Sequence, residues 1–288
     1  MTFFDPALAA LLLSPWALGL LGLCIGSFLN VVVHRVPRML EAQWCRECAE
    51  LMEVPVPEKG REALSLWKPR SRCPSCGHVI RWYENVPVLS WLALRGRCSA
   101  CKTRIGWRYP LVEVATAGLF AWMGVQFGAT PVALLWCAFV AVLLALALID
   151  WDTTLLPDGL TQPLLWGGLI AAALGWNGRL GDALWGAVAG YLSLWTVTWL
   201  FKLATGKVGM GNGDFKLLAA LGVWLGPVMI LPIVLGASMI GAVVGIGLKL
   251  GGQLREGRFV PFGPFLAGAG LVVLLAGHDT VTGWLGWY

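Results

Sequence analysis

The sequence predicts an all-α polytopic membrane protein with about eight transmembrane helices and a small polar domain between the first two. Hydrophobic residues make up 58% of the 288 residues, charged residues make up 13%, and the mean hydropathy is +0.73. Soluble domains are ~45–50% apolar and about 25% charged, so most of this chain is expected to face lipid. These values exclude a soluble enzyme, a disordered protein and a secreted disulfide scaffold.

The apolar segments are expected to be transmembrane helices, because a span needs roughly 20 apolar residues. The first 33 residues contain no Lys or Arg. They therefore lack the basic region of a cleavable signal peptide and are expected to form a retained first helix. The long apolar run 215–248 is expected to break at Gly226-Pro227. The candidate spans are 7–30, 111–128, 131–149, 160–176, 183–201, 214–226, 227–249 and 262–283.

The basic residues favour eight spans with the N-terminus outside. This arrangement places 20 of the 21 Lys and Arg residues in or beside inside segments, and leaves only Arg179 outside. Seven spans would move Arg255 and Arg258 outside as well. The inside segments are then 34–108, 150–159, 202–213 and 250–261.

The polar segment 34–108 holds 14 of the basic residues and six of the eight cysteines. The pairs Cys73/Cys76 and Cys98/Cys101 are each spaced Cys-x2-Cys, which is typical of a structural zinc site with four thiolate ligands. A segment of this size is small for a self-sufficient core, so a metal or disulfide that stabilises it is expected. Disulfides are disfavoured because thiols stay reduced in the cytosol.

A third pair, Cys45/Cys48, has no fourth-turn partner. It is either an incidental insertion or a competitor for metal, and we expect it to be non-essential. Cys24 and Cys137 lie in apolar spans and are expected to be small core residues.

Four carboxylates at span ends are functional candidates, because ionisable groups in the membrane are costly: Asp150, Asp152, Asp158 and Asp214. Asp158 and Asp214 precede apolar runs and have helix capping as an alternative role, while Asp152 has the alternative of a solvated loop carboxylate. Two such groups brought together can share one proton, so that one activates water while the other polarises a scissile carbonyl. The sequence has neither His-Glu-x-x-His nor Gly-x-Ser-x-Gly.

The chain resembles the bacterial type IV prepilin peptidases, which combine leader peptidase and N-methyltransferase activities. The motifs that carry the resemblance are Gly26-Ser27-Phe28-Leu29-Asn30-Val31-Val32-Val33-His34-Arg35, the cysteine pairs of 73–101, Glu84-Asn85-Val86-Pro87-Val88-Leu89-Ser90-Trp91-Leu92, Arg108-Tyr109-Pro110-Leu111-Val112-Glu113, the segment Asp150 to Asp158, and Gly211-Asn212-Gly213-Asp214.

The resemblance implies a GxGD-type aspartyl protease with a presenilin-like helical core, in which Asp150 and Asp214 are catalytic and Asp152 is the fallback for Asp150. Gly211 and Gly213 are expected to let the substrate backbone reach the carboxylates. The implied metal is a structural zinc ion held by Cys73, Cys76, Cys98 and Cys101.

The implied reaction removes the basic leader of prepilins and pseudopilins after Gly, at the cytoplasmic face of the inner membrane. S-adenosylmethionine then methylates the new N-terminus. The expected division is a first helix (1–33), a cytoplasmic zinc domain (34–108) and a seven-helix protease domain (109–288), with a periplasmic N-terminus and no nucleic-acid partner. Candidate contributors to methyl transfer or substrate binding are His34, Glu84, Asn85, Gly96, Arg97 and Glu113.

Three alternatives to the bifunctional peptidase and methyltransferase differ in the role that they give to the carboxylates. A peptidase without methyltransferase activity keeps Asp150 and Asp214 catalytic. A zinc-domain scaffold does not need them. A proton-coupled transporter is expected to carry ionisable groups near the midplane, whereas these two lie at span ends.

Overall fold

A computed structural model describes residues 6–61, 64–207, 209–251 and 260–286. The regular structure of these residues is helical, and the β-structure found among them is two isolated bridges, which confirms the predicted all-α class. The chain forms two compact units, Met1–Ala141 and Val142–Tyr288.

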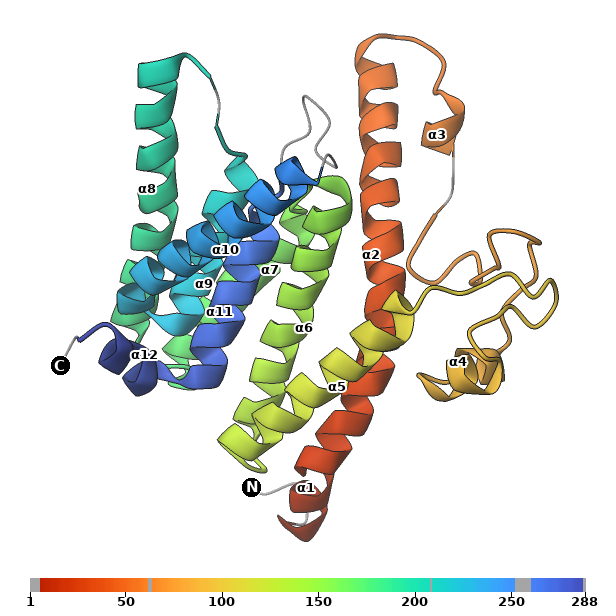
Figure 1. Cartoon of the computed structure of the whole chain (residues 1–288), viewed down its shortest axis with the longest axis horizontal. Coiled ribbons are helices and arrows are strands. Elements are labelled where there is room, and N and C mark those ends of the chain that lie inside the picture. The colour runs from red at the N-terminus through yellow and green to blue at the C-terminus, as the bar shows by residue number, and fades with distance from the viewer. Residues whose placement is uncertain (1–5, 62–63, 208, 252–259, 287–288) are drawn as a thin grey trace. The chain divides into compact units, whose positions relative to one another are not determined.

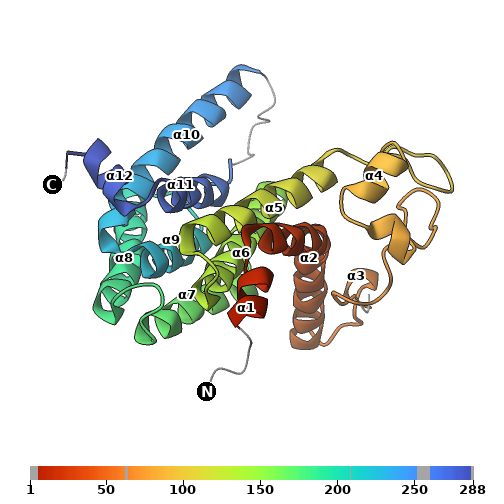
Figure 2. The ribbon, with the colours of Figure 1, turned by 90° about the horizontal axis from the view of Figure 1, so that it is seen from below.

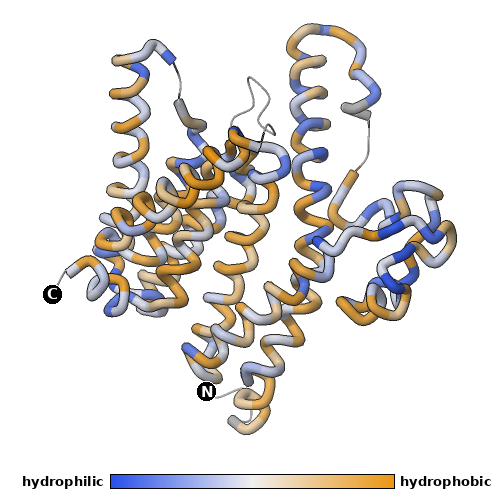
Figure 3. Tube along the Cα trace, viewed as in Figure 1, coloured by the Kyte–Doolittle hydropathy of each residue, from blue (hydrophilic) through white to orange (hydrophobic). Residues whose placement is uncertain are grey.

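The first unit contains a very long helix that changes character along its length. Helix α2 begins after Ser14, whose hydroxyl accepts a hydrogen bond from the backbone of Ala17. It does not end near residue 33, as a first span alone would, but continues to Leu51 through Pro37. Figure 3 shows its N-terminal part as mostly apolar and its C-terminal part as richer in polar residues. The other helices of this unit are α1 (Pro6–Leu12), α3 (Glu58–Arg61), η1 (Trp82–Asn85), α4 (Leu89–Ala93), α5 (Arg108–Phe127) and the first part of α6 (Pro131–Thr153).

Glycines allow α2 and α5 to pack closely. A Cβ atom at Gly22 would lie 2.7 Å from the Cα of Ala117, and one at Gly26 would lie 2.7 Å from the Cα of Glu113. Small residues at such positions let helix backbones approach each other in a membrane, where van der Waals contact replaces the hydrophobic effect. The start of the Gly26–Arg35 motif therefore has a packing role.

The second unit is a group of helices around the short helix α9 (Asn212–Leu225), which contacts α7, α8, α10 and α11 (Figures 1 and 2). Ten of the 14 residues of α9 are buried. Gly226, at φ +86°, ends α9 before Pro227, so the predicted break is present. The surrounding helices are α7 (Asp158–Ala173), α8 (Leu180–Thr205), η2 (Pro227–Met229), α10 (Ile230–Leu250), α11 (Gly263–Ala276) and α12 (His278–Trp284).

Among the described residues, five helices are long and apolar enough to cross a membrane, or six if the bent pair α11 and α12 forms one span. Helices α7 and α9, with 16 and 14 residues, are shorter than the spans in that count. The chain is thus a multi-pass membrane protein, and the number eight stays a prediction. Arg255 and Arg258, on which the choice of eight spans depended, lie outside the described residues.

Candidate active site and metal centre

Two buried carboxylates come together in the second unit. Asp150 lies near the C-terminal end of α6 and Asp214 lies in the first turn of α9; their exposed fractions are 4% and 8%. The two are close enough for their charges to interact. Oδ2 of Asp150 and Oδ1 of Asp214 are both buried without a hydrogen-bond partner among the described residues. Because a buried polar atom without a partner is costly, this pair has the character of a reaction site.

The neighbouring carboxylates have other surroundings. Asp152, two residues after Asp150, is exposed, as expected because two helical positions differ by about 200° around the axis. Asp158 is the first residue of α7, whose N-cap is Pro157, so it is not the capping residue considered above. Its two carboxylate oxygens instead accept hydrogen bonds from Lys216 Nζ at 2.7 and 2.8 Å. This ion pair joins the N-terminal ends of α7 and α9.

The glycines before Asp214 differ in the space around them. Gly211 is the N-cap residue of α9, and a Cβ atom there would meet no other atom within 4 Å. A Cβ atom at Gly213 would lie 2.8 Å from the Cβ of Leu156. Asp214 is the third residue of the helix rather than its cap. Gly213 is therefore tightly packed, while Gly211 borders open space.

Gly263 is a site residue that the sequence reasoning missed. A Cβ atom at this position would lie 2.6 Å from Oδ2 of Asp150 and 3.3 Å from Leu156 Cδ1. The side chain of Leu156 thus packs against both Gly213 and Gly263. The available signal was the segment Pro261-Phe262-Gly263-Pro264, in which a glycine stands between two prolines at the start of an apolar run. Helix α11 therefore presents backbone, not a side chain, to Asp150.

The first unit brings together the four cysteines of the predicted zinc site. The sulfur atoms of Cys73, Cys76, Cys98 and Cys101 lie within 4.8 Å of one another. The Cys73–Cys101 and Cys76–Cys98 sulfur distances are 3.7 and 4.0 Å. A tetrahedral zinc ion with Zn–S bonds of about 2.3 Å needs sulfur atoms about 3.8 Å apart. The donor set and its spacing therefore fit a structural zinc ion.

Two similar turns position these thiols. The amide of Cys73 donates to the carbonyl of His78, and the amide of Cys98 donates in the same way to Thr103. The residue after each pair has a positive φ, +71° at Gly77 and +58° at Lys102. Hydrogen bonding to the side chain and backbone of Thr103 lowers the pKa of the Cys101 thiol to about 6. A low thiol pKa favours the thiolate that a metal binds.

Glu84 links the two turns from helix η1. His78 Nε2 lies 3.2 Å from both Glu84 Oε2 and the hydroxyl of Ser99, so one residue from each turn joins the cluster. The backbone N–H of Arg81, followed by Ser99 and His78, lowers the pKa of the Glu84 carboxyl to about 2. Glu84 is therefore ionised, and through His78 and Ser99 it links the two turns that carry the cysteines.

The other sequence candidates are spread along the first unit. Buried Glu113 accepts a hydrogen bond from the backbone of Val88 at 2.7 Å, which ties the segment after η1 to α5. Gly96, at φ +63°, packs against Trp91, and His34 is exposed on α2. A further anchor that sequence reasoning did not single out is Arg35, which is buried and donates to the carbonyls of Ser65, Leu66 and Pro69.

Comparison with known proteins gives a consistent result over both units. The bacterial peptidase A24 N-terminal domain matches residues 20–127, and the type IV leader peptidase family matches residues 137–246. Proteins named prepilin leader peptidase/N-methyltransferase are similar over most of their length. The one from Stutzerimonas stutzeri is 50% identical over 92% of this chain and 91% of its own. The one from Pseudomonas aeruginosa is 53% identical over 91% and 90%, and the one from Pseudomonas putida is 55% identical over 90% and 89%.

No solved structure gives a significant match. The matches to relatives cover about nine tenths of the chain. The two family-model matches include both aspartates and all four cysteines of the cluster. The chain belongs to the type IV leader peptidase family.

Proposed function

We propose that this protein removes the basic leader peptide from type IV prepilins and type II secretion pseudopilins after Gly, and then methylates the new N-terminus with S-adenosylmethionine. The observation that carries the proposal is the buried pair Asp150 and Asp214, each with an oxygen that has no partner among the described residues. Such a pair in a leader peptidase is suited to peptide hydrolysis.

The chemistry needs two carboxylates in different protonation states. In aspartyl proteases the pair holds one proton between its members. The ionised carboxylate takes a proton from water as the water attacks the scissile carbonyl, while the protonated one donates a hydrogen bond to the carbonyl oxygen. The nitrogen of the leaving peptide then receives a proton from the pair. Oδ2 of Asp150 and Oδ1 of Asp214 are free for these transfers.

We assign Gly211 and Gly213 to substrate binding, because residues without side chains let the substrate backbone approach Asp214. The open space at Gly211 can admit an extended peptide next to Asp214. A Gly211→Ala, Gly213→Ala double variant is expected to cleave slowly, and unchanged cleavage would contradict this role.

The cysteine cluster is assigned a structural zinc ion, held by Cys73, Cys76, Cys98 and Cys101, in a cytoplasmic domain of residues 34–108 between a first helix (1–33) and the protease domain (109–288). The N-terminus then lies in the periplasm. S-adenosylmethionine supplies the methyl group, and we assign it no binding residues. From the resemblance to the family, we expect a folded zinc domain to support methyl transfer.

The test is mass spectrometry of a prepilin incubated with the purified, detergent-solubilised protein and S-adenosylmethionine. Wild type should yield a product without the leader and with one added methyl group. Asp150→Asn and Asp214→Asn should abolish cleavage, whereas the exposed Asp152→Asn serves as the matched control and should retain it. Cleavage by either of the first two variants would refute the assignment of Asp150 and Asp214 as the catalytic pair. Cleavage without methylation would reduce the enzyme to a peptidase.

A further inference from the structure

The pair Cys45 and Cys48 has no role in the proposed function. Both residues lie on the C-terminal part of α2, which carries more polar residues than its beginning. Cys45 is half-buried, Cys48 is exposed, and both are free thiols. Two accessible thiols one helical turn apart are candidate ligands for a soft metal ion.

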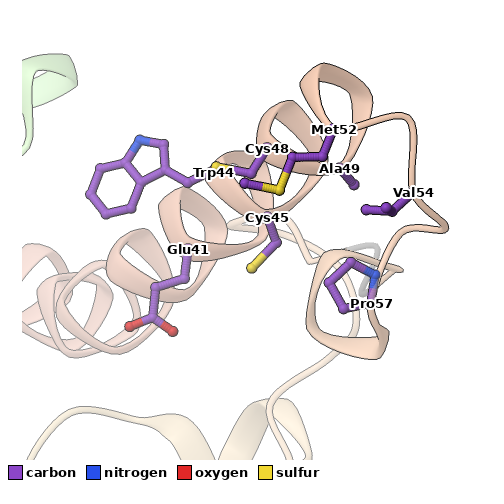
Figure 4. Close-up of a pocket in the computed structure, with 8 residues that line it drawn as sticks. All are labelled: Glu41, Trp44, Cys45, Cys48, Ala49, Met52, Val54 and Pro57. Atoms are coloured by element: carbon purple, nitrogen blue, oxygen red, sulfur yellow. The ribbon is translucent and has the colours of Figure 1, made fainter.

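These thiols lie in line with a third sulfur-bearing residue. Met52 follows Cys48 by four positions and keeps a helical conformation as the C-cap of α2. Residues three and four positions apart lie on the same side of a helix, so Cys45, Cys48 and Met52 form a stripe. This stripe lines a cavity of about 480 Å³ between the end of α2 and the chain that returns along Val54 and Pro57 (Figure 4).

The rest of the cavity wall is almost wholly apolar. It is formed by Trp44, Ala49, Val54 and Pro57, with Glu41 as the charged residue at its edge. Thiolates and a thioether are soft ligands, which select Cu(I) over hard cations. Trp44, Met52 and Val54 are 44%, 72% and 50% exposed, so the cavity opens to solvent and an ion can enter it.

A second zinc site fits these residues less well than Cu(I). Structural zinc takes four ligands. Among the described residues, the His, Cys, Asp and Glu ligand atoms that gather within 4.8 Å of one another are the sulfur atoms of Cys73, Cys76, Cys98 and Cys101. Glu41, Cys45 and Cys48 are not gathered in this way. Cu(I) requires fewer ligands and accepts sulfur from Met, which the stripe provides.

We infer that Cys45, Cys48 and Met52 bind one Cu(I) ion in the cavity at the end of α2. On binding, the two thiols each release a proton to solvent and two copper–thiolate bonds form, while the thioether donates a lone pair. Copper remains Cu(I) throughout, so the step needs no oxidant or reductant. The site is independent of the proposed peptidase and methyltransferase activities.

The test is an anaerobic titration of the full-length, zinc-loaded protein in detergent with Cu(I), in competition with the chromogenic chelator bathocuproine disulfonate. Metal content is measured by mass spectrometry after desalting. Wild type should retain one Cu(I) per chain without loss of zinc. A Cys45→Ser, Cys48→Ser variant should lose this copper, and Met52→Leu should weaken its binding about tenfold because it removes a soft ligand.

The matched control is a Cys24→Ser, Cys137→Ser variant, which removes two thiols elsewhere and should bind copper like wild type. Zinc content and leader cleavage measured on every variant show that the chain is folded. Copper binding that is unchanged in Cys45→Ser, Cys48→Ser would overturn the inference. So would copper uptake that occurs only as zinc is lost, or an unchanged affinity in Met52→Leu.

Discussion

The contact between Gly263 and Asp150 predicts that a single added methyl group disables the peptidase. In Gly263→Ala the new Cβ atom would lie 2.6 Å from Oδ2 of Asp150 and 3.1 Å from its Cγ. Ordinary van der Waals contacts begin near 3.4 Å, so the carboxylate or α11 must move by about 0.8 Å. Misplacing a reacting group by about 1 Å costs on the order of 100-fold in rate. We therefore expect cleavage to fall about 100-fold.

The assay is the initial rate of leader removal from a prepilin, followed by mass spectrometry. Alanine is the better helix former by about 1 kcal/mol, so a loss of rate cannot come from the propensity of α11. Gly268→Ala in the same helix is the matched control, because a Cβ atom there meets nothing within 4 Å. Methylation of a peptide that already has its mature N-terminus should be unchanged in both variants. Cleavage by Gly263→Ala within about threefold of wild type, less than about 1 kcal/mol in barrier, would refute the reasoning.

Three further predictions concern the supports of the two sites. Charge reversal at Asp158 or Lys216 should slow cleavage several-fold, because their ion pair joins α7 to α9, and the swapped double variant should recover; failure to recover would argue against the pair. Gly190→Ala should lower the free energy of unfolding by ~1–3 kcal/mol through overpacking against α9, measured by thermal unfolding in detergent; an unchanged melting temperature would contradict this. Thr103→Val should raise the pKa of Cys101, so protons displace zinc from the variant at a higher pH than from wild type. Zinc release is followed with a chromogenic indicator as the pH is lowered, and release from both proteins at the same pH would contradict the prediction.

The sequence was sufficient for features that depend on local pattern. The all-helical class, the break at Gly226-Pro227 and the gathering of four cysteines each follow from composition or short spacing. The burial of Asp150 beside Asp214 was expected only from the family resemblance, because the spacing of two carboxylates along a chain does not show that they meet. Asp150 is buried and Asp152 is exposed, because two helical positions differ by about 200° around the axis. This difference favours Asp150 over Asp152 as the proposed catalytic residue.

The contacts that the sequence did not predict join positions far apart along the chain. Gly263 follows Asp150 by more than 100 residues, and nothing in the pattern around either residue names the other. Hydropathy also did not predict that α2 continues to Leu51, because the helical pattern persists after the apolar pattern ends. Helices α7 and α9 were expected as spans by apolar content, yet their lengths of 16 and 14 residues are set by where their caps fall.

The position of Asp214 depends on Gly186 and Gly190, two residues of α8 that pack against α9 and not against a carboxylate. A Cβ atom at Gly190 in α8 would lie 2.5 Å from the carbonyl oxygen of Leu218, and one at Gly186 would collide with the backbone of Gly222. Helix α9 can therefore approach α8 only because α8 has the spacing Gly-x3-Gly there. Asp214 lies one helical turn before Leu218, so the register of this backbone contact fixes where its carboxylate stands. The position of Asp214 thus depends on two glycines that sequence analysis alone would assign to an ordinary lipid-facing span.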